Sequence, residues 1–393
     1  MTILSFADTR FPIERANGVQ TMATCCAMAA RGHHVTLLVR PDSVIPARDP
    51  FQFYGLAPLP TLTIAPVQAA GGTTGRRVHM LWTGLRRALA AGVDLVYTRD
   101  LGLAALLARV PPTRRPKLAY ESHGIAPVVS ALMPQWLGSS VPVPSHRKIA
   151  RLDRREALVW SRADAYVTIT QTLADDLAAR YGERDRVFVV PDGAAAAAPD
   201  AAPRPGAPRI RAAYAGHLYP WKGADVFLQA LAATPEVDGL IIGGHPGEAD
   251  LARLTALGAS LGLGARLTIT GLLPPAAVAG ALGAADIFVL PNTATAISER
   301  YTSPLKLFEY LAQGGAIVAS DLPAIREVLT HDETALLVPP GDVSALAAAL
   351  ATLATDAPRR LRLGRAARTL SDDYTWDRRA ARLEEAFASV VPA

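Results

Sequence analysis

The sequence predicts an α/β protein with two doubly wound domains, and three observations lead to this fold class. The chain has 393 residues, a length at which one hydrophobic core usually divides into two. Short apolar segments alternate with helical segments, as in parallel β-α-β units. The alternation stops in an Ala- and Pro-rich stretch and then resumes. We therefore expect a first domain at residues 1–193, a linker at 194–208, a second domain at 209–373 and a final helical segment at 374–393.

The N-terminal residues predict the first β-α-β unit. Ile3–Phe6 is expected to be a strand, a loop follows to Asn17, a helix runs from Gly18 to about Arg31, and His34–Val39 is expected to be the next strand. The loop has one glycine instead of the three of the dinucleotide-binding fingerprint, so a nicotinamide site is disfavoured. Gly18 could still let the backbone approach a phosphate or a sugar; the alternative is a plain turn residue.

Further units complete the first domain. Residues 126–145 are rich in Pro and Gly and are expected to form an irregular loop. The other strands are expected at Asp94–Thr98, Lys117–Tyr120, Ala165–Ile169 and Val187–Val190, and the other helices at Leu101–Ala108, His146–Trp160 and Gln171–Tyr181.

The second domain repeats the pattern after the linker. Its strands are expected at Arg211–Ala215, Gly239–Ile242, Arg266–Thr270, Asp286–Leu290 and Ala316–Ala319, and its helices at Asp225–Ala233, Asp250–Gly258, Ala276–Leu282, Val343–Ala354 and Pro358–Leu370. A last helix is expected from Trp376 to about Val391.

Polar and glycine-containing loops follow the predicted strands. They are the loop at Gly18, Glu121–Gly124, Asp192-Gly193, His217–Gly223 and the loop that ends at Ser303. Ligands of doubly wound sheets bind beyond the carboxyl ends of the strands, so two sheets that face one another would bring these loops together.

The stretch from Ser303 to Gly314 has the features of a phosphate-binding helix. We expect Ser303 as N-cap, Pro304 at the first helical position and Gly314 as a left-handed C-cap. The free N–H groups of the first turn then attract an anion, and Lys306 adds a full charge. Glu309 shares a face with Lys306 and could bind ribose hydroxyls. The alternative is a capped surface helix with an ordinary Lys/Glu pair.

Composition limits the classes of function. The formal net charge is +5, which suits anionic small molecules or an anionic membrane surface but is too small to indicate nucleic acid. Cys25 and Cys26 are the two cysteines, and their adjacency gives neither a disulfide framework nor metal-ligand spacing, as expected in a reducing cytoplasm. The apolar run from Ile3 to Ala7 is too short for a signal peptide, and no run approaches the length of a membrane span.

The ordered set of motifs resembles family 4 of the retaining glycosyltransferases, which have the GT-B fold of two facing Rossmann-like domains. The resemblance covers almost the whole chain. The segments that carry it are Gly18, Glu121-Ser122-His123-Gly124, Pro191-Asp192-Gly193, Tyr214-Ala215-Gly216-His217 with Lys222-Gly223, Ala285-Asp286, and Ser303-Pro304-Leu305-Lys306-Leu307-Phe308-Glu309-Tyr310. The final Trp376-Asp377 helix resembles the one that crosses back onto the N-terminal domain in that fold.

The resemblance implies roles for individual residues. Lys222 resembles the lysine that holds the donor diphosphate, Glu309 the carboxylate that binds ribose, and His123 the histidine that reaches the transferred sugar; these three form the expected catalytic set. The expected donor-binding residues are Gly18, Gly216, His217, Lys222, Gly223, Ser303, Pro304, Leu305, Lys306 and Glu309. Glu121, His245, Glu299 and Tyr301 are candidates for sugar or acceptor contacts.

Two positions depart from the family pattern. Members often carry Arg where His217 stands, as a partner of the lysine, and a neutral His would weaken diphosphate binding. They also often carry a Glu, which reads the donor sugar, where this chain has Tyr301. Glu299 or loop N–H groups could take over that task.

The resemblance implies a cytoplasmic enzyme that moves a sugar from a nucleoside-diphosphate sugar to a glycan, lipid-linked or small-molecule acceptor with retention of configuration. No Asp-x-Asp occurs in the sequence, so we expect no metal and no other cofactor. A sugar-nucleotide epimerase of the same fold and a non-catalytic sugar-nucleotide-binding protein are the alternatives.

The predicted helix at His146–Trp160 is strongly basic, with Arg147, Lys148, Arg151, Arg154 and Arg155. It could contact anionic lipid at the inner face of a membrane. The alternative, which we prefer, is a solvated helix face partly paired with its own acidic residues, Asp153 and Glu156.

Overall fold

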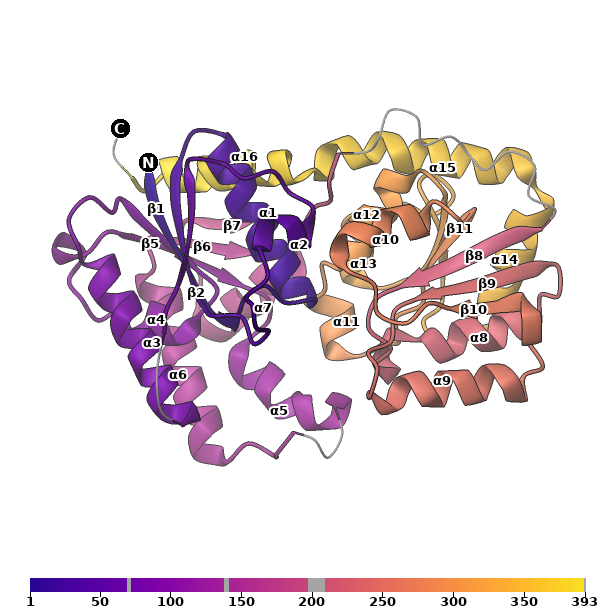
Figure 1. Ribbon diagram of the computed structural model, residues 1–393, viewed down its shortest axis with the longest axis horizontal. Helices are drawn as coiled ribbons and strands as arrows, with labels where there is room; N and C mark the ends of the chain where they lie inside the picture. The colour runs from indigo at the N-terminus through magenta and orange to yellow at the C-terminus, as the bar shows by residue number, and fades with distance from the viewer. Residues whose placement is uncertain (69–71, 138–140, 197–208, 392–393) are drawn as a thin grey trace. The chain divides into compact units, whose positions relative to one another are not determined.

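The computed structural model describes residues 1–68, 72–137, 141–196 and 209–391. The chain divides into two compact units: the first holds the N-terminal part up to Pro191 together with the C-terminal helix, except for a short segment that starts at Gln135, and the second holds that segment and residues 192–375. Each contains a parallel sheet with helices on both faces, which confirms the predicted α/β class (Figure 1). Of the expected linker at 194–208, residues 197–208 lie outside the described residues.

The first unit has a seven-stranded parallel sheet in the order β3-β2-β1-β4-β5-β6-β7. The strands are β1 (Thr2–Arg10), β2 (His34–Arg40), β3 (Leu62–Pro66), β4 (Leu95–Thr98), β5 (Lys117–Ser122), β6 (Ala165–Thr168) and β7 (Val187–Val189). The helices are α1 (Ala16–Ala30), α2 (Pro50–Tyr54), α3 (Thr73–Ala88), α4 (Leu101–Leu107), α5 (Ala126–Leu137), α6 (His146–Arg162) and α7 (Gln171–Tyr181). The strand order reverses between β1 and β4, and such a switch point is where doubly wound sheets bind ligands.

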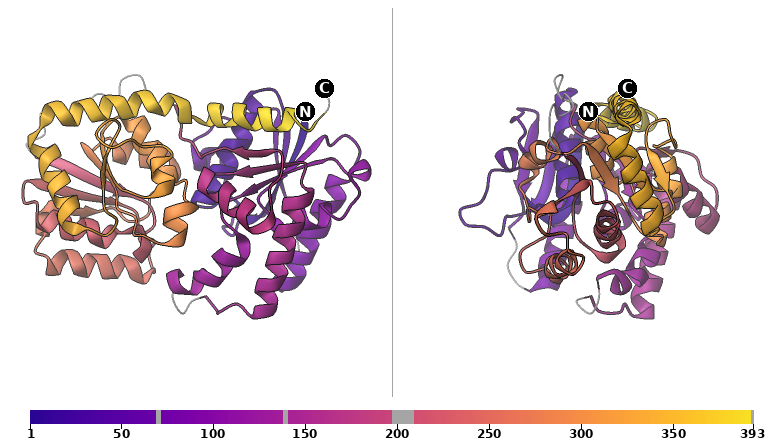
Figure 2. Two further views of the ribbon diagram at one scale, coloured as in Figure 1. Left: turned by 180° about the vertical axis from the view of Figure 1, so that it is seen from behind. Right: turned by 90° about the vertical axis from the view of Figure 1, so that its right-hand side faces the viewer.

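Alternate strand residues bury opposite faces of this sheet. One face packs Ile3, Leu37 and Tyr97 against α1 and against the C-terminal helix α16 (Trp376–Ala388). Both cysteines lie in this core as free, buried thiols, as expected. Figure 2 shows the yellow ribbon of α16, from two further sides, next to the indigo N-terminal elements. The expected return of the C-terminal helix to the N-terminal domain is therefore confirmed.

The second unit has a six-stranded parallel sheet in the order β10-β9-β8-β11-β12-β13, with its switch point between β8 and β11. The strands are β8 (Ile210–Ala215), β9 (Val237–Ile242), β10 (Leu267–Ile269), β11 (Ile287–Leu290), β12 (Ala316–Ser320) and β13 (Leu336–Val338). The helices are α8 (Ala224–Ala232), α9 (Ala249–Ser260), α10 (Pro275–Leu282), α11 (Ala296–Arg300), α12 (Leu305–Gln313), α13 (Pro323–Arg326), α14 (Val343–Thr355) and α15 (Ala357–Ser371).

The two faces of this second sheet carry different helices. Tyr214, Ile241 and Val289 face a core shared with α8, α9 and α14. Their neighbours along the strands, among them Ala215, Ile242 and Leu290, face α10 and α12. The short helix α12 is thereby fixed by packing on the sheet, and its first turn lies next to the strand ends.

The prediction of an irregular loop at residues 126–145 is wrong for its first part, because α5 occupies Ala126–Leu137. Pro127 lies in the first turn, where a missing N–H costs nothing, and the backbone N–H of Ala126 donates to the carboxylate of Glu156. Prolines in this stretch are therefore compatible with the start of a helix as well as with a loop. The sequence analysis also missed α2, β3, α3, α11, α13 and β13.

Glu156 is buried beneath this helix start. Burial raises its pKa to about 7, although hydrogen bonds from Ala126 N–H and from the Tyr166 hydroxyl act in the opposite direction. The folded state then holds a proton that the unfolded chain releases near pH 4.5, so this residue's contribution to stability falls as the pH rises towards 7.

We expect Glu156→Gln to mimic the protonated side chain, so that the variant does not lose stability from this residue as the pH rises. Relative to the variant, the unmodified protein should lose about 2.5 kcal/mol of unfolding free energy between pH 5 and pH 8. Urea unfolding of both proteins at the two pH values measures the difference. A difference between them that stays constant with pH would contradict the assignment.

Candidate functional site

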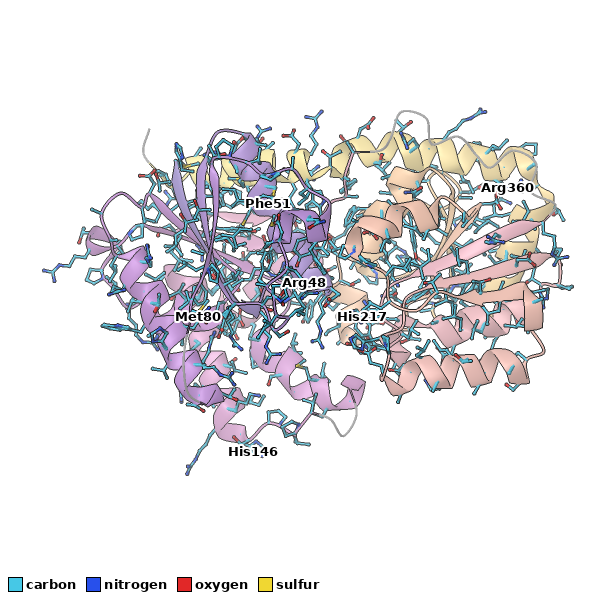
Figure 3. All side chains as sticks on the ribbon, in the orientation of Figure 1. Arg48, Phe51, Met80, His146, His217 and Arg360 are labelled. Carbon is cyan, nitrogen blue, oxygen red and sulfur yellow. The ribbon has the colours of Figure 1, made fainter. Side chains whose placement is uncertain are left out.

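The loops that follow β8 and β11 meet at the switch point of the second sheet. The loop after β8 contains Gly216 and His217 and then a short 3₁₀ turn, η3 (Pro220–Lys222). Figure 3 labels His217 in this loop. The backbone N–H of Thr293, in the loop after β11, donates to the carbonyl of Trp221 over 3.1 Å. The two loops are therefore held as one structural element.

Gly223 allows this close approach. Its φ is +72°, and an added Cβ would lie 1.8 Å from the carbonyl oxygen of Pro291. A residue with a side chain would have to displace the loop after β11, so glycine is required here by packing as well as by conformation. The position of Lys222, the residue before it, is fixed in turn.

Two lysines lie next to this element, and each has its Nζ over an aromatic ring. Lys306 in α12 is 8% exposed, and its Nζ has no hydrogen-bond partner within the described residues; it lies 3.9 Å from the ring centre of Tyr214. Lys222 is half-buried, with its Nζ 3.7 Å from the ring centre of Trp221. The faces of aromatic rings attract cations but do not neutralise them.

The electrostatics of these lysines favour an added anion. Burial lowers the pKa of Lys222 to about 7. Burial lowers the pKa of Lys306 well below its usual range, the nearby charge of Lys222 lowers it further, and Glu309 opposes both. A bound phosphate would remove the repulsion and supply the missing acceptors, so the pair is suited to an anion with several oxygens.

Glu309 lies one turn along α12 from Lys306 and is half-buried. Burial raises its pKa to about 7, while Lys306 lowers it. A carboxylate that is partly desolvated and close to a cation can accept hydrogen bonds from neutral hydroxyl groups, as the sequence analysis expects for a ribose.

The expected capping of α12 is wrong in detail. The helix begins at Leu305, Pro304 occupies the N-cap position, and no side chain caps the first turn. The hydroxyl of Ser303 instead accepts a hydrogen bond from the backbone N–H of Asp192 over 2.9 Å. Among the residues that the structure describes, the N-cap position thus gives the first turn no side-chain hydrogen bond, and Gly314 ends the helix with φ +71°, as expected.

The remaining predicted residues of this unit surround the lysines or lie further along the strand ends. His217 stacks on Tyr219 with ring centres 5.1 Å apart, and Tyr219 stacks on Trp221 at 6.5 Å. Tyr301 is buried directly after α11, and Glu299 is half-buried within that helix. His245 follows β9 and is exposed, with its Nδ1 2.8 Å from the carbonyl of Pro246.

The first unit has its own pocket, with a volume of about 460 Å³, at the switch point of its sheet. One part of it is lined by Asp8 and Thr9 of β1, by Thr98–Asp100 at the end of β4, and by Glu121 and His123 at the end of β5. Apolar side chains of α5 and α6, including Val129 and Leu152, line another part. The pocket therefore combines hydroxyl and charged groups with an apolar wall, which suits a polyol that carries a less polar portion.

Glu121 and His123 are brought together in this pocket. Nε2 of His123 lies 2.5 Å from one oxygen of Glu121, and Gln20 donates to the same oxygen over 2.8 Å. Burial alone would raise the pKa of Glu121, but Arg379 and His123 more than offset it and hold the pKa well below its usual range. The buried carboxylate is therefore ionised and fixes the imidazole.

Gly18 has a packing role that the sequence analysis did not anticipate. The helix α1 begins two residues earlier, at Ala16, and an added Cβ on Gly18 would lie 2.5 Å from both Ile13 Cγ2 and the hydroxyl of Tyr54. That hydroxyl donates to the carbonyl of Ile13. Gly18 is buried, while its neighbour Asn17 lines the pocket.

Sequence reasoning missed two groups of site residues. Asn292 is fully buried in the loop after β11, and both polar atoms of its side-chain amide have no hydrogen-bond partner in the described part of the chain. The rule that strand-following loops carry ligands could have found it. Gln20, Tyr97 and Arg379, which contact Glu121, have no local signal.

Two searches of the described ranges found nothing. No group of three or more His, Cys, Asp or Glu residues there could hold a metal ion. No helix there has the length and apolar character needed to cross a bilayer.

Two protein-family models match the chain, one in each unit. The model described as "Glycosyl transferase 4-like domain" matches residues 17–193, and the model described as "Glycosyl transferases group 1" matches residues 209–356. The matches follow the division of the chain into two α/β units.

Curated relatives point in the same direction. The chain is 29% identical over 297 residues to a D-inositol 3-phosphate glycosyltransferase of Nocardia farcinica, a match that covers 70% of this chain and 62% of the relative. It is 31% identical over 291 residues to the protein of that name from Xylanimonas cellulosilytica, covering 70% and 66%. The matched region thus spans a little under two thirds of these relatives.

Solved structures share the fold. HepE of Anabaena, solved in complex with UDP-glucose, superimposes with a TM-score of 0.74 and 18% identity, covering 99% of this chain and 100% of that one. At this level of identity the likeness shows the fold alone.

Proposed function

The chain belongs to family 4 of the glycosyltransferases, whose fold is GT-B, and from this premise we propose that it moves a hexose from a nucleoside-diphosphate sugar to an acceptor hydroxyl with retention of anomeric configuration. One observation carries the proposal: Lys306 lies near enough to Lys222, at the switch point of the second sheet, for the two charges to repel, and its Nζ has no hydrogen-bond partner within the described residues. A diphosphate supplies the charge that this site lacks.

The same lysines would act on the chemical step. When the bond between the sugar C1 and the diphosphate oxygen breaks, negative charge grows on the departing phosphate. Lys222, Lys306 and the uncapped first turn of α12 stabilise that charge, which is electrostatic catalysis by pre-organised groups. The acceptor oxygen bonds to C1 on the same face, and its proton passes to the departing phosphate oxygen. No metal takes part in this proposal.

Residues of both units would hold the substrates. Glu309 accepts hydrogen bonds from the ribose, and His123, held by Glu121, orients a hydroxyl of the transferred sugar. The pocket of the first unit takes the acceptor, and its hydroxyl-rich lining suits a polyol. Because curated relatives are named for D-inositol 3-phosphate, inositol phosphates are the first small-molecule acceptors to test, before glycans and lipid-linked acceptors.

The test combines donor binding with product analysis. A thermal-shift panel of UDP-, GDP- and ADP-sugars selects the donor, since a ligand at 100 times its dissociation constant adds about 2.7 kcal/mol of stability. Proton NMR of fresh product from an α-linked donor should then show an α-linkage. An initial β-anomer would overturn retention, an epimerised sugar nucleotide would indicate the epimerase, and binding without turnover would indicate a binding protein.

We also propose that the protein is cytoplasmic and contacts the inner face of the membrane at its periphery. Arg147, Lys148, Arg151 and Arg154 are exposed along α6. The expected pairing partners in this helix do not serve them: Asp153 pairs with Arg180, and Glu156 is buried. On α3, which has no acidic residue, Trp82 is 63% exposed. Basic and aromatic side chains together suit an anionic bilayer.

We expect sedimentation with vesicles that contain phosphatidylserine, and none with pure phosphatidylcholine vesicles. Each basic residue near such a surface contributes about 1 kcal/mol, so the double variant Lys148→Glu/Arg151→Glu should lose most of the binding. The control is Arg365→Glu, an exposed basic residue on α15. Equal sedimentation with both kinds of vesicle, or full binding by the double variant, would contradict the proposal.

A further inference from the structure

A buried arginine of the C-terminal helix lies behind the candidate sugar-binding histidine. Arg379 of α16 is 1% exposed. Its guanidinium donates to one oxygen of Glu121 over 2.5 Å and to the backbone carbonyls of Val190 and Pro191 over 2.7 and 2.8 Å. Its Nε donates to the hydroxyl of Thr24 over 3.2 Å. The donors of this guanidinium thus join α16, α1, the end of β7 and the end of β5.

Glu121 connects this arginine to His123. Arg379 and the hydroxyl of Tyr97 donate to Oε2 of Glu121, while Gln20 and His123 meet Oε1. Arg99 is linked to the Glu121 carboxylate through Gln20, because it donates to the side-chain oxygen of Gln20. Four elements, α1, β4, β5 and α16, therefore contribute polar groups to this cluster or to its surroundings.

We propose that Arg379 is a positioning residue for the sugar-transfer reaction, which acts through Glu121 to hold His123 in one orientation and one protonation state. The inference rests on the proposed function, in which His123 orients the transferred sugar. Glu121 and Arg379 are nearly inaccessible to solvent, while His123 is partly exposed and lines the pocket. The chain thus buries the charged pair, and of these three side chains the imidazole is the one most exposed to the pocket.

The physical argument concerns the charge of a buried carboxylate. A buried ionised carboxylate needs a partner, and removal of that partner leaves an uncompensated charge or forces the group to take up a proton. A nearby positive charge also lowers the proton affinity of the Glu121–His123 pair as a whole. Without Arg379 the pair should bind its first proton at a higher pH, and the imidazole should lose its fixed anionic acceptor.

The experiment measures transfer by Arg379→Met and Glu121→Gln variants and their double variant, with Arg378→Met as the control on the exposed side of the same helix. We expect Arg379→Met to lower kcat at least tenfold, with KM for the donor and the affinity for UDP, GDP or ADP within twofold of their original values. The acid limb of the kcat profile should move up by at least about one pH unit, which loss of packing alone would not cause. Arg378→Met should change nothing.

The double variant tests whether Arg379 acts through Glu121. If it does, Arg379→Met should have little further effect on kcat in the Glu121→Gln background, since the two residues then act as a unit. If the double variant lost kcat by the product of the two single-variant factors, the inference would be overturned. It would also be overturned if the pH profile of kcat did not shift in Arg379→Met. Arg379→Lys keeps the positive charge, so its pH profile of kcat should stay close to that of the unmodified protein. This variant replaces Arg379→Met in the test if the methionine variant does not fold. No transfer by the unmodified protein would refute the proposed function itself.

Discussion

Replacement of Lys306 by methionine is expected to lower kcat/KM ten- to a hundredfold and, at the same time, to raise the melting temperature of the ligand-free protein. A hydrogen bond between charged groups contributes about 1.5–3 kcal/mol, which corresponds to this range of rates. The stability should change in the opposite direction, because Lys306 is 8% exposed and its Nζ has no hydrogen-bond partner in the part of the chain that the structure describes. Methionine fills similar space without the cost of a desolvated amine.

Steady-state kinetics and thermal unfolding of the same preparation measure both effects. Lys222→Met should lower kcat/KM by a similar factor, with a smaller gain in stability because Lys222 is only half-buried. Lys148→Met, on the exposed face of α6, is the matched control and should leave both quantities unchanged when the acceptor is soluble. Unchanged kinetics in both site variants would remove the lysines from the site.

Replacement of His123 by alanine is expected to lower kcat at least tenfold while the affinity for nucleoside diphosphate stays within about twofold. His123 belongs to the first unit, and the proposed phosphate site belongs entirely to the second. The imidazole is held by Glu121 and should act on the transferred sugar, an interaction that matters after the donor has bound.

Calorimetry with nucleoside diphosphate and steady-state kinetics separate the two quantities. His79→Ala, an exposed histidine on α3, serves as control. If nucleoside diphosphate affinity fell as much as kcat, the role assigned to His123 would be wrong, although the lysine site would stand.

The fold could be predicted in outline because parallel α/β units leave local signals. The strands at Ile3–Phe6 and Asp286–Leu290 are short, mainly apolar runs; the first lies inside β1, which continues to Arg10, and the second differs from β11 by one residue at its start. The segment between residues 40 and 93 was missed because α3 has alternating basic and apolar residues on an exposed face. Val78 and Trp82 are exposed while Met80 and Ala88 are buried, so the pattern does not mark a core helix.

The candidate site could be predicted where spacing fixes geometry. Lys306 and Glu309 share a face of one helix, and the sequence predicts that relation directly. Spacing does not predict that Lys306 is desolvated against Tyr214 or that its charge is close to that of Lys222, because those contacts join different strands and loops. The cap was predicted wrongly for the same reason: the Ser303 hydroxyl binds Asp192, more than a hundred residues away.

Long-range contacts account for the rest. Arg379 and Glu121 are 258 residues apart, and only the return of the C-terminal helix to the first unit brings them together. The resemblance to the family implied that return, but not which side chain it buries. Gly18 is similar, since its contact with Tyr54 depends on α2, an element without a clear pattern.

Calorimetric titration with UDP, GDP and ADP at pH 8, with EDTA present, tests the central claim most directly. Lys222, whose pKa burial lowers to about 7, is mostly neutral at that pH in the free protein, and a bound diphosphate favours its charged form. The account predicts that the preferred nucleotide binds without metal and that binding takes up close to one proton or more, measured from the dependence of the binding heat on the buffer. Both should be lost in the Lys222→Met/Lys306→Met variant. The account would be contradicted if nucleotide binding needed Mg²⁺ or Mn²⁺, or if the protein took up no proton when the nucleotide binds.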